Sequence, residues 1–120
     1  MGKVQVTLIV KQSEISREVK DPLVFVLDEG ATIIDVINLA DREILKAGKF
    51  PVKGYKSLLQ MVYHPFENRF YEQVAVQGYT SPGSFLNLRE NPRKPLPNSV
   101  TIVLVPEGPC ISGWEKTVDI

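Results

Sequence analysis

The stretch Phe25-Val-Leu-Asp-Glu-Gly-Ala-Thr-Ile-Ile-Asp-Val-Ile37 decides the fold of this 120-residue chain. It opens with apolar residues, and Asp28-Glu29-Gly30 predicts the end of a strand. Thr32 is a good N-cap because its hydroxyl can accept a backbone N–H, and Asp35 stands where a capping-box acid is expected. Helical spacing then predicts a helix over residues 33–47. Its buried stripe is predicted to contain Ile33, Val36, Ile37, Ala40, Ile44 and Ala47.

Three further stretches are predicted to form the strands that this helix covers. Residues 4–10 alternate between apolar and polar side chains, which is the pattern of a half-buried strand. Residues 23–27 are apolar on both faces, which is typical of a central strand. Residues 100–105 form a last strongly apolar strand, which Pro106 ends. We expect the first and last strands to be parallel neighbours in the centre of the sheet.

The middle third of the chain is predicted to add a hairpin. Residues 58–63 and 70–76 are rich in β-branched and aromatic residues, and a five-residue connection with proline and asparagine joins them. The polar stretch 11–16 and residues 78–84 are predicted to be turns, and residues 85–88 a short strand. Residues 50–57 and the proline-rich residues 92–97 are predicted to be loops. The fold class is therefore α+β, with a mixed sheet packed on one main helix and an extra hairpin.

Composition bounds the class of protein. Fourteen basic and fourteen acidic side chains cancel, and 43% of residues are hydrophobic, which is enough for the core of one soluble domain. We expect that domain to span residues 1–106, with residues 107–120 as a tail packed on it. The pI near 6.6 argues against nucleic-acid binding, and no apolar run approaches the length of a membrane span. We expect a cytoplasmic protein.

Two stretches resemble segments of a known superfamily. Residues 25–37 are similar to the strand-to-helix segment of ubiquitin-like proteins, and Pro97-Asn-Ser-Val-Thr-Ile-Val-Leu-Val105 resembles their closing strand. This resemblance implies a β-grasp fold. Ubiquitin and the small sulfur-carrier proteins end in Gly-Gly soon after that strand, whereas this sequence ends in Asp119-Ile120, so their carrier chemistry is not implied. The longer middle hairpin looks more like β-grasp modules that bind ligands or subunits.

Candidate catalytic groups are few. Cys110 is the single cysteine, and a nucleophilic thiol needs a nearby histidine or helix N-terminus to lower its pKa. His64 is the single histidine and is predicted to lie in the hairpin turn, where one histidine does not build a metal site. The carboxylate pairs Asp28/Glu29 and Asp41/Glu43 are predicted to be surface charges. We therefore predict no metal, no cofactor and no catalytic residues, with Cys110 kept as a candidate reactive thiol.

Aromatic residues are the most suggestive feature for function. They gather in the middle of the chain, where residues 44–94 carry eight basic and only three acidic side chains. Aromatic residues together with arginine are typical of interface centres. Two interpretations stay open: ordinary packing of the hairpin onto the sheet, or an exposed surface for a partner or an anionic ligand. The candidate surface consists of Tyr55, Tyr63, Phe66, Arg69, Phe70, Tyr71 and Tyr79.

These observations favour a non-catalytic protein-interaction module or accessory subunit. A small-ligand-binding β-grasp domain is the alternative, and a sulfur-carrier relative or a cysteine-dependent enzyme is a more distant one. We also expect a homodimer with its contact near residues 58–76. The reason is that apolar groups on both faces of the hairpin are hard for one small domain to cover.

Overall fold

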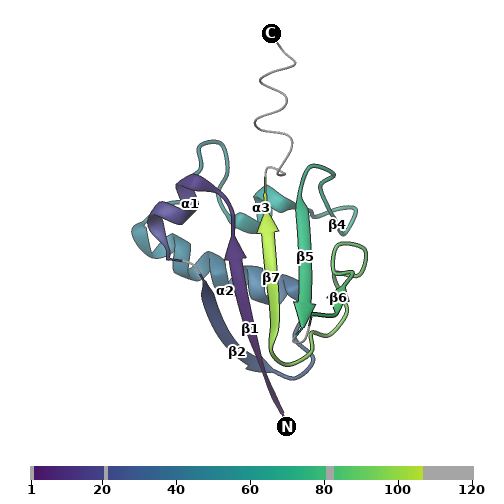
Figure 1. Cartoon of the computed structure of the whole chain (residues 1–120). Coiled ribbons are helices and arrows are strands. Elements are labelled where there is room, and N and C mark those ends of the chain that lie inside the picture. The colour runs from purple at the N-terminus through teal and green to yellow at the C-terminus, as the bar shows by residue number, and fades with distance from the viewer. Residues whose placement is uncertain (1, 21, 81–82, 107–120) are drawn as a thin grey trace.

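The computed structural model describes residues 2–20, 22–80 and 83–106, which form a five-stranded sheet and the helices that cover one of its faces. The strands lie in the order β2-β1-β7-β5-β6, and Figure 1 shows α2 (Ile33–Ile44) behind them. A separate two-stranded sheet is formed by β3 and β4. The predicted α+β class, with a mixed sheet packed on one main helix and an extra hairpin, is confirmed. The tail of residues 107–120 lies outside the described residues.

The centre of the sheet is the predicted parallel pair. β1 (Lys3–Val10) pairs with β7 (Val100–Val105) over the register Val6↔Val100 to Val10↔Leu104. The same strand β1 pairs antiparallel with β2 (Leu23–Asp28), which places β2 at the edge of the sheet. The prediction that β2 is central was wrong. Its residues Val24 and Val26 are 54% and 65% exposed, so its second apolar row faces away from the core.

The main helix begins and ends close to the predicted positions. The N–H of Thr32 donates to Oδ2 of Asp35 at 2.9 Å, as expected of a capping box. The α-helix ends at Ile44, and a 3₁₀ turn, η1 (Leu45–Ala47), completes the predicted range. The predicted stripe is buried through Ile44, and only Ala47 lies outside it, since the 3₁₀ turn changes the spacing.

One predicted turn is a short helix. Residues 13–18 form α1 (Ser13–Glu18), where a turn was predicted over 11–16. The side chain of Gln12 caps this helix, because its Oε1 accepts the N–H of Ile15 at 2.8 Å. Ile15 is fully buried in the common core. Its single apolar side chain was too weak a periodic signal to predict the helix.

The predicted strand at residues 58–63 is a helix in the structure. α3 (Leu58–Val62) buries Leu58, Met61 and Val62, which are spaced at helical intervals. Ser57 begins it, with Oγ accepting the N–H of Gln60 at 3.0 Å. The predicted hairpin is present in shorter form, because β3 (Tyr63–His64) follows α3 directly and pairs with β4 (Arg69–Phe70).

The strand predicted at 70–76 begins later in the structure. β5 (Ala75–Thr80) includes the first three residues of the predicted turn at 78–84 and pairs with β7 and with β6 (Phe85–Leu86). Gly78 lies in the middle of β5, and a Cβ there would stand 2.6 Å from Cδ1 of the buried Leu88. Gly78 therefore serves a close side-chain approach rather than a turn.

Candidate protein-binding surfaces

The most exposed large apolar side chain of the described residues lies in the turn between β3 and β4. We call residues 64–69 the hairpin tip. Phe66 is 90% exposed there. The ring of His64 lies edge-on to Phe66 with centroids 6.3 Å apart, and it lies 5.5 Å from the ring of Tyr71. Phe66 thus projects to solvent from a small aromatic base.

Several short-range interactions hold the hairpin tip in one shape. Nδ1 of His64 accepts the N–H of Glu67 at 3.2 Å, and the carbonyl of His64 accepts the N–H of Asn68 at 2.9 Å. Asn68 has a φ of 54°, a left-handed conformation that asparagine tolerates well. The guanidinium of Arg69 pairs with the Glu67 carboxylate and holds the pKa of that carboxyl below its usual value.

The base of the hairpin is anchored to the rest of the domain. Nη1 of Arg89 donates to the carbonyls of Tyr71 and Val74, at 3.0 and 2.8 Å. The N–H of Tyr71 donates to the carbonyl of Val62 at 3.0 Å. These bonds connect the tip to α3 and to the loop that follows β6. The tip therefore presents Phe66 from a supported frame.

Two members of the predicted aromatic surface belong to the core. Tyr63 and Phe70 are directly paired across β3 and β4, and their rings meet edge to face with centroids 5.2 Å apart. Both side chains are buried. Of the two interpretations left open by the sequence, Tyr63 and Phe70 therefore fit packing of the hairpin in the core and not an exposed surface. An acidic substitution at Phe70 would consequently unfold the hairpin, so it does not serve as a test of self-association.

The remaining predicted residues fall in three places. Arg69 and Tyr71 belong to the hairpin with Phe66. Tyr55 is 40% exposed and lines an open hollow of about 360 Å³ together with Tyr71, Gln60 and Met61. Tyr79 lies on β5, where its ring centroid is 6.5 Å from that of Phe85. The structure therefore brings together only part of the predicted surface.

A second apolar surface was not predicted from the sequence. We call the side of the five-stranded sheet opposite α2 the open face; Figure 1 shows no helix of the described chain in front of it. Side chains alternate between the faces of a strand, and the register aligns the outward rows of all five strands. The available signals were the apolar residues on both faces of the segments 23–27 and 100–105. Its apolar members are Ile9, Val24, Val26, Ala75, Tyr79, Phe85, Val103 and Val105.

Asp41 is a buried charge, so its assignment to the surface was wrong. Only 7% of this residue is exposed, and its carboxylate accepts the N–H of Leu58 at 2.6 Å and that of Leu59 at 3.1 Å. Burial raises the pKa of Asp41, and these two hydrogen bonds oppose that shift. Asp41, on α2, thus accepts the first two N–H groups of α3, which have no acceptor within that helix. Asp41 therefore acts as a structural clamp between the two helices.

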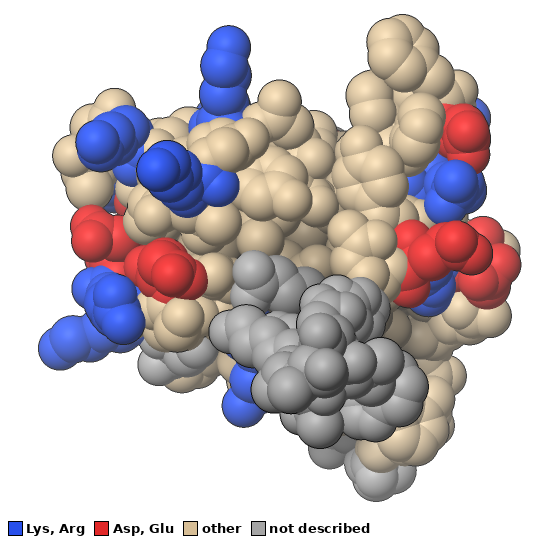
Figure 2. Space-filling view, turned by 90° about the horizontal axis from the view of Figure 1, so that it is seen from above, with Lys and Arg blue, Asp and Glu red and all other residues tan. Residues whose placement is uncertain are grey.

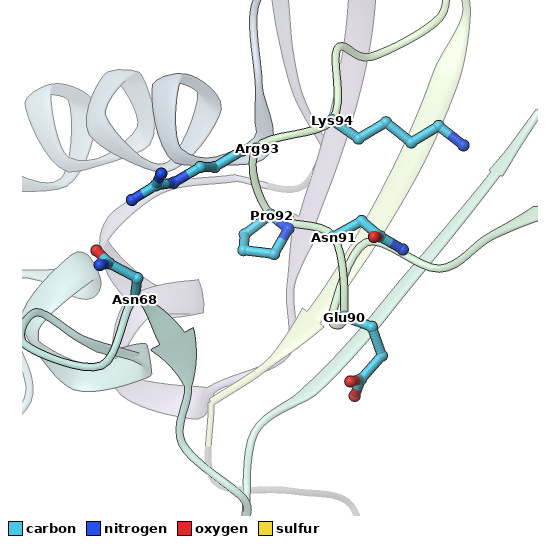
Figure 3. Close-up of a pocket in the computed structure, with 6 residues that line it drawn as sticks. All are labelled: Asn68, Glu90, Asn91, Pro92, Arg93 and Lys94. Atoms are coloured by element: carbon cyan, nitrogen blue, oxygen red, sulfur yellow. The ribbon is translucent and has the colours of Figure 1, made fainter.

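Polar loops also leave a hollow beside the hairpin tip. This open hollow, of about 720 Å³, is lined by Asn68 and by residues 90–94. Figure 3 shows Arg93 extending toward the side of Asn68, whereas Lys94 points the opposite way. The two cations do not converge on one point. The hollow is thus not a built anion site.

Acidic and basic side chains are mixed on the end of the molecule that is uppermost in Figure 1 and faces the viewer in Figure 2. Figure 2 shows acidic and basic side chains in neighbouring positions on both flanks. The basic excess of residues 44–94 is therefore partly balanced in space by acids from outside that segment, as in the pair Lys46–Glu43. Charge attraction alone does not single out a partner surface here.

Within residues 2–20, 22–80 and 83–106, no three histidine, cysteine, aspartate or glutamate side chains are grouped so as to hold a metal ion. No helix in this part of the chain is long and apolar enough to cross a membrane. Cys110 lies outside the described residues, so its distance from His64 is not defined. The predicted absence of nucleic-acid binding and the predicted cytoplasmic location stay predictions.

Comparison with known proteins adds no relative. No family model matches the chain, and neither a curated protein nor a solved structure matches it. Functional inference rests on the two surfaces described above, the hairpin tip and the open face.

Proposed function

We propose that this chain is a non-catalytic protein-interaction module whose main contact is the hairpin tip. The observation that carries the proposal is Phe66, a large aromatic side chain that is 90% exposed on a turn fixed by hydrogen bonds. Burying an exposed phenylalanine in a partner removes a large apolar area from water. Because the turn is already ordered, binding loses little conformational entropy, which favours affinity.

The shape of the tip favours a protein partner over a small molecule. Small ligands bind in concave sites that enclose most of their surface, whereas Phe66 projects outward. A projecting aromatic residue is the usual anchor that fills a pocket on a partner protein, with charged residues at the rim. Arg69 and Glu67 would supply that rim. The partner is therefore proposed to present an apolar pocket with polar edges.

A β-grasp relationship to ubiquitin-like proteins belongs to this proposal. What supports it is the mixed sheet with parallel β1 and β7 in the centre and one main helix packed on it. Those modules commonly bind other proteins without catalysis, which agrees with the proposed role.

The experiment compares two exposed phenylalanines on different surfaces. The full chain, immobilised through a tag, is incubated with lysate of its source cells, and the retained proteins are quantified by mass spectrometry. Phe66→Ala is expected to lose a protein that the unchanged chain retains. Phe85→Ala is the matched control, since Phe85 is 81% exposed but lies on the open face, and this variant is expected to retain the same protein. Unchanged far-ultraviolet circular dichroism confirms that both variants fold.

The opposite pattern overturns the proposal. Loss of the retained protein with Phe85→Ala but not with Phe66→Ala would move the contact to the open face. Equal retention by all three chains would remove Phe66 from any interface.

The open hollow of about 360 Å³ that Tyr55 and Tyr71 line supports a second candidate function. Tyr55 and Tyr71, two of the predicted ligand-surface residues, line it together with polar Gln60 and Gln73. A small planar ligand bound there would contact tyrosine side chains and amide groups. Thermal-shift screening with aromatic metabolites tests this, since Tyr55→Ala should abolish any shift that the unchanged chain shows. A shift that survives in Tyr55→Ala would exclude this hollow.

Self-association stays a prediction. Its main argument, that the apolar residues of segment 58–76 are uncovered, is weakened because Leu58, Met61, Val62 and Phe70 are buried within one chain. Light scattering at micromolar concentration decides between one chain and two.

A further inference from the structure

The open face ends at the point where the described chain stops. β7 is the middle strand of the sheet, and its outward residues Val103 and Val105 belong to the open face. Pro106 follows directly and is buried. The next residues of the chain are thus attached at the end of the middle strand, at one edge of the open face, which no described residue covers.

The sequence of residues 107–120 suits a segment that reverses direction and then packs by one side. Glu107-Gly108-Pro109 is a turn sequence, because glycine permits left-handed backbone and proline fixes φ. From Trp114 on, the even positions carry Trp114, Val118 and Ile120 together with one charged residue, Lys116, while Glu115, Thr117 and Asp119 occupy the odd ones. This period-two pattern gives an extended segment one largely apolar side.

The segment is also long enough. The eleven residues from Cys110 to Ile120 reach about 36 Å when extended, at about 3.3 Å per residue. A strand of six residues such as β7 spans only about 20 Å. A chain that turns back after Pro106 can therefore cross the whole open face.

We propose that residues 110–120 lie across the open face of the sheet and cover Val103, Val105 and their neighbours within the same chain. The tail turns at Gly108-Pro109 and directs Trp114 onto the centre of the sheet. A second copy of the chain is the less favoured occupant. The reason is that covalent attachment next to Val105 gives the tail a millimolar effective concentration, which a free partner at micromolar concentration does not match.

The experiment uses the single tryptophan of the full chain, Trp114, as the probe. In the folded chain its fluorescence emission should lie at shorter wavelength than in denaturant, and acrylamide should quench it less. Val103→Glu places a charge at the centre of the open face and should shift the emission toward that of the unfolded chain. Phe66→Glu is the control of the same chemistry on the hairpin tip and should leave the emission unchanged.

A second measurement does not depend on the Val103 variant folding. Cys110 is the single cysteine, so a second cysteine reports its position. Gln77→Cys, exposed on the open face opposite Val103, should form an intramolecular disulfide under mild oxidation. Asn38→Cys, exposed on α2 on the other side of the sheet, should not.

Three results would overturn the proposal. The first is folded-state emission of Trp114 equal to that in denaturant, which means a free tail. The second is cross-linking that is equal for Gln77→Cys and Asn38→Cys. The third is a short-wavelength emission that disappears on dilution, which assigns the cover to a second copy.

Discussion

Replacing Asp41 by alanine should destabilise the domain strongly, although this residue touches no proposed binding surface. The N–H groups of the first three residues of α3 have no partner in the helical ladder, and the structure pairs each of them. Those of Leu58 and Leu59 donate to the Asp41 carboxylate, and that of Gln60 donates to Oγ of Ser57. Asp41→Ala leaves two of the three without their acceptor, at a site where the Leu58 side chain is fully buried.

The magnitude follows from these two bonds. Hydrogen bonds to a charged group contribute about 1.5–3 kcal/mol each, so their loss costs about 3–6 kcal/mol. Removing a buried carboxylate also removes its desolvation penalty, which offsets part of this loss. The expected net decrease in the free energy of unfolding is about 2–4 kcal/mol. For a domain of this size that corresponds to a fall in Tm of about 8–16 °C.

Urea unfolding followed by circular dichroism measures the effect. Asp41→Asn keeps one acceptor oxygen and should fall between the unchanged chain and Asp41→Ala. Asn38→Ala is the control, because Asn38 is exposed one turn earlier on the same helix, and it should change the free energy by less than about 0.5 kcal/mol. If Asp41→Ala behaved like Asn38→Ala, the clamp between α2 and α3 would not exist.

Three further predictions concern the core and its titration. Gly78→Ala should lower the free energy of unfolding by about 1–3 kcal/mol, because the added methyl group overpacks against Leu88. In a Leu88→Ala background, which is less stable by itself, the same Gly78 substitution should have almost no effect. Equal effects in both backgrounds would refute the contact. Burial raises the pKa of Asp41, so the folded chain binds a proton at this carboxyl more tightly than the unfolded chain does. Proton binding at Asp41 therefore stabilises the folded chain at low pH. This stabilisation is lost as the pH rises from the ordinary pKa of an aspartate through the raised pKa of Asp41. The stability difference between the unchanged chain and Asp41→Asn should therefore narrow as pH rises from about 3.5 toward neutrality, and a constant or widening difference would contradict the raised pKa. Amide exchange should be slowest in β1 and β7, since central strands open only on near-global unfolding, and fast exchange in either would contradict the sheet order.

The elements that the sequence predicted well are those whose signals are local and repeated. α2 combines a capping box with five buried positions at helical spacing, so its start and its buried side follow from the residues alone. β1 has clear alternation and β7 is a strongly apolar run, and placing them side by side buries the largest apolar rows. The class of fold follows once these three elements are known.

The failures have a common physical origin in tertiary contacts. The apolar residues of segment 58–63 suit a strand by propensity, but α3 forms because Asp41, seventeen residues earlier, supplies acceptors for its first N–H groups. In the sequence Gly78 suggests a turn, but in the structure the Leu88 side chain occupies the space that a side chain at position 78 would need. β2 looks central because Val24 and Val26 are apolar, whereas their row faces outward on an edge strand.

The candidate surface was predicted only in part for the same reason. Sequence composition identified the aromatic residues of the middle third but not which of them point inward. Tyr63 and Phe70 face each other in the core, whereas Phe66 lies between them in sequence at the exposed turn. Predicting the open face requires the order and register of five strands, and no local sequence pattern contains that information.

The most direct test of the proposed function is amide hydrogen exchange of the chain, alone and bound to the protein that the capture experiment retains. We predict that binding slows exchange at the hairpin tip, in residues 64–69, and leaves the edge strands β2 and β6 unchanged. Slowed exchange in β2 and β6, with no change at the hairpin tip, would contradict the proposal and assign the partner to the open face.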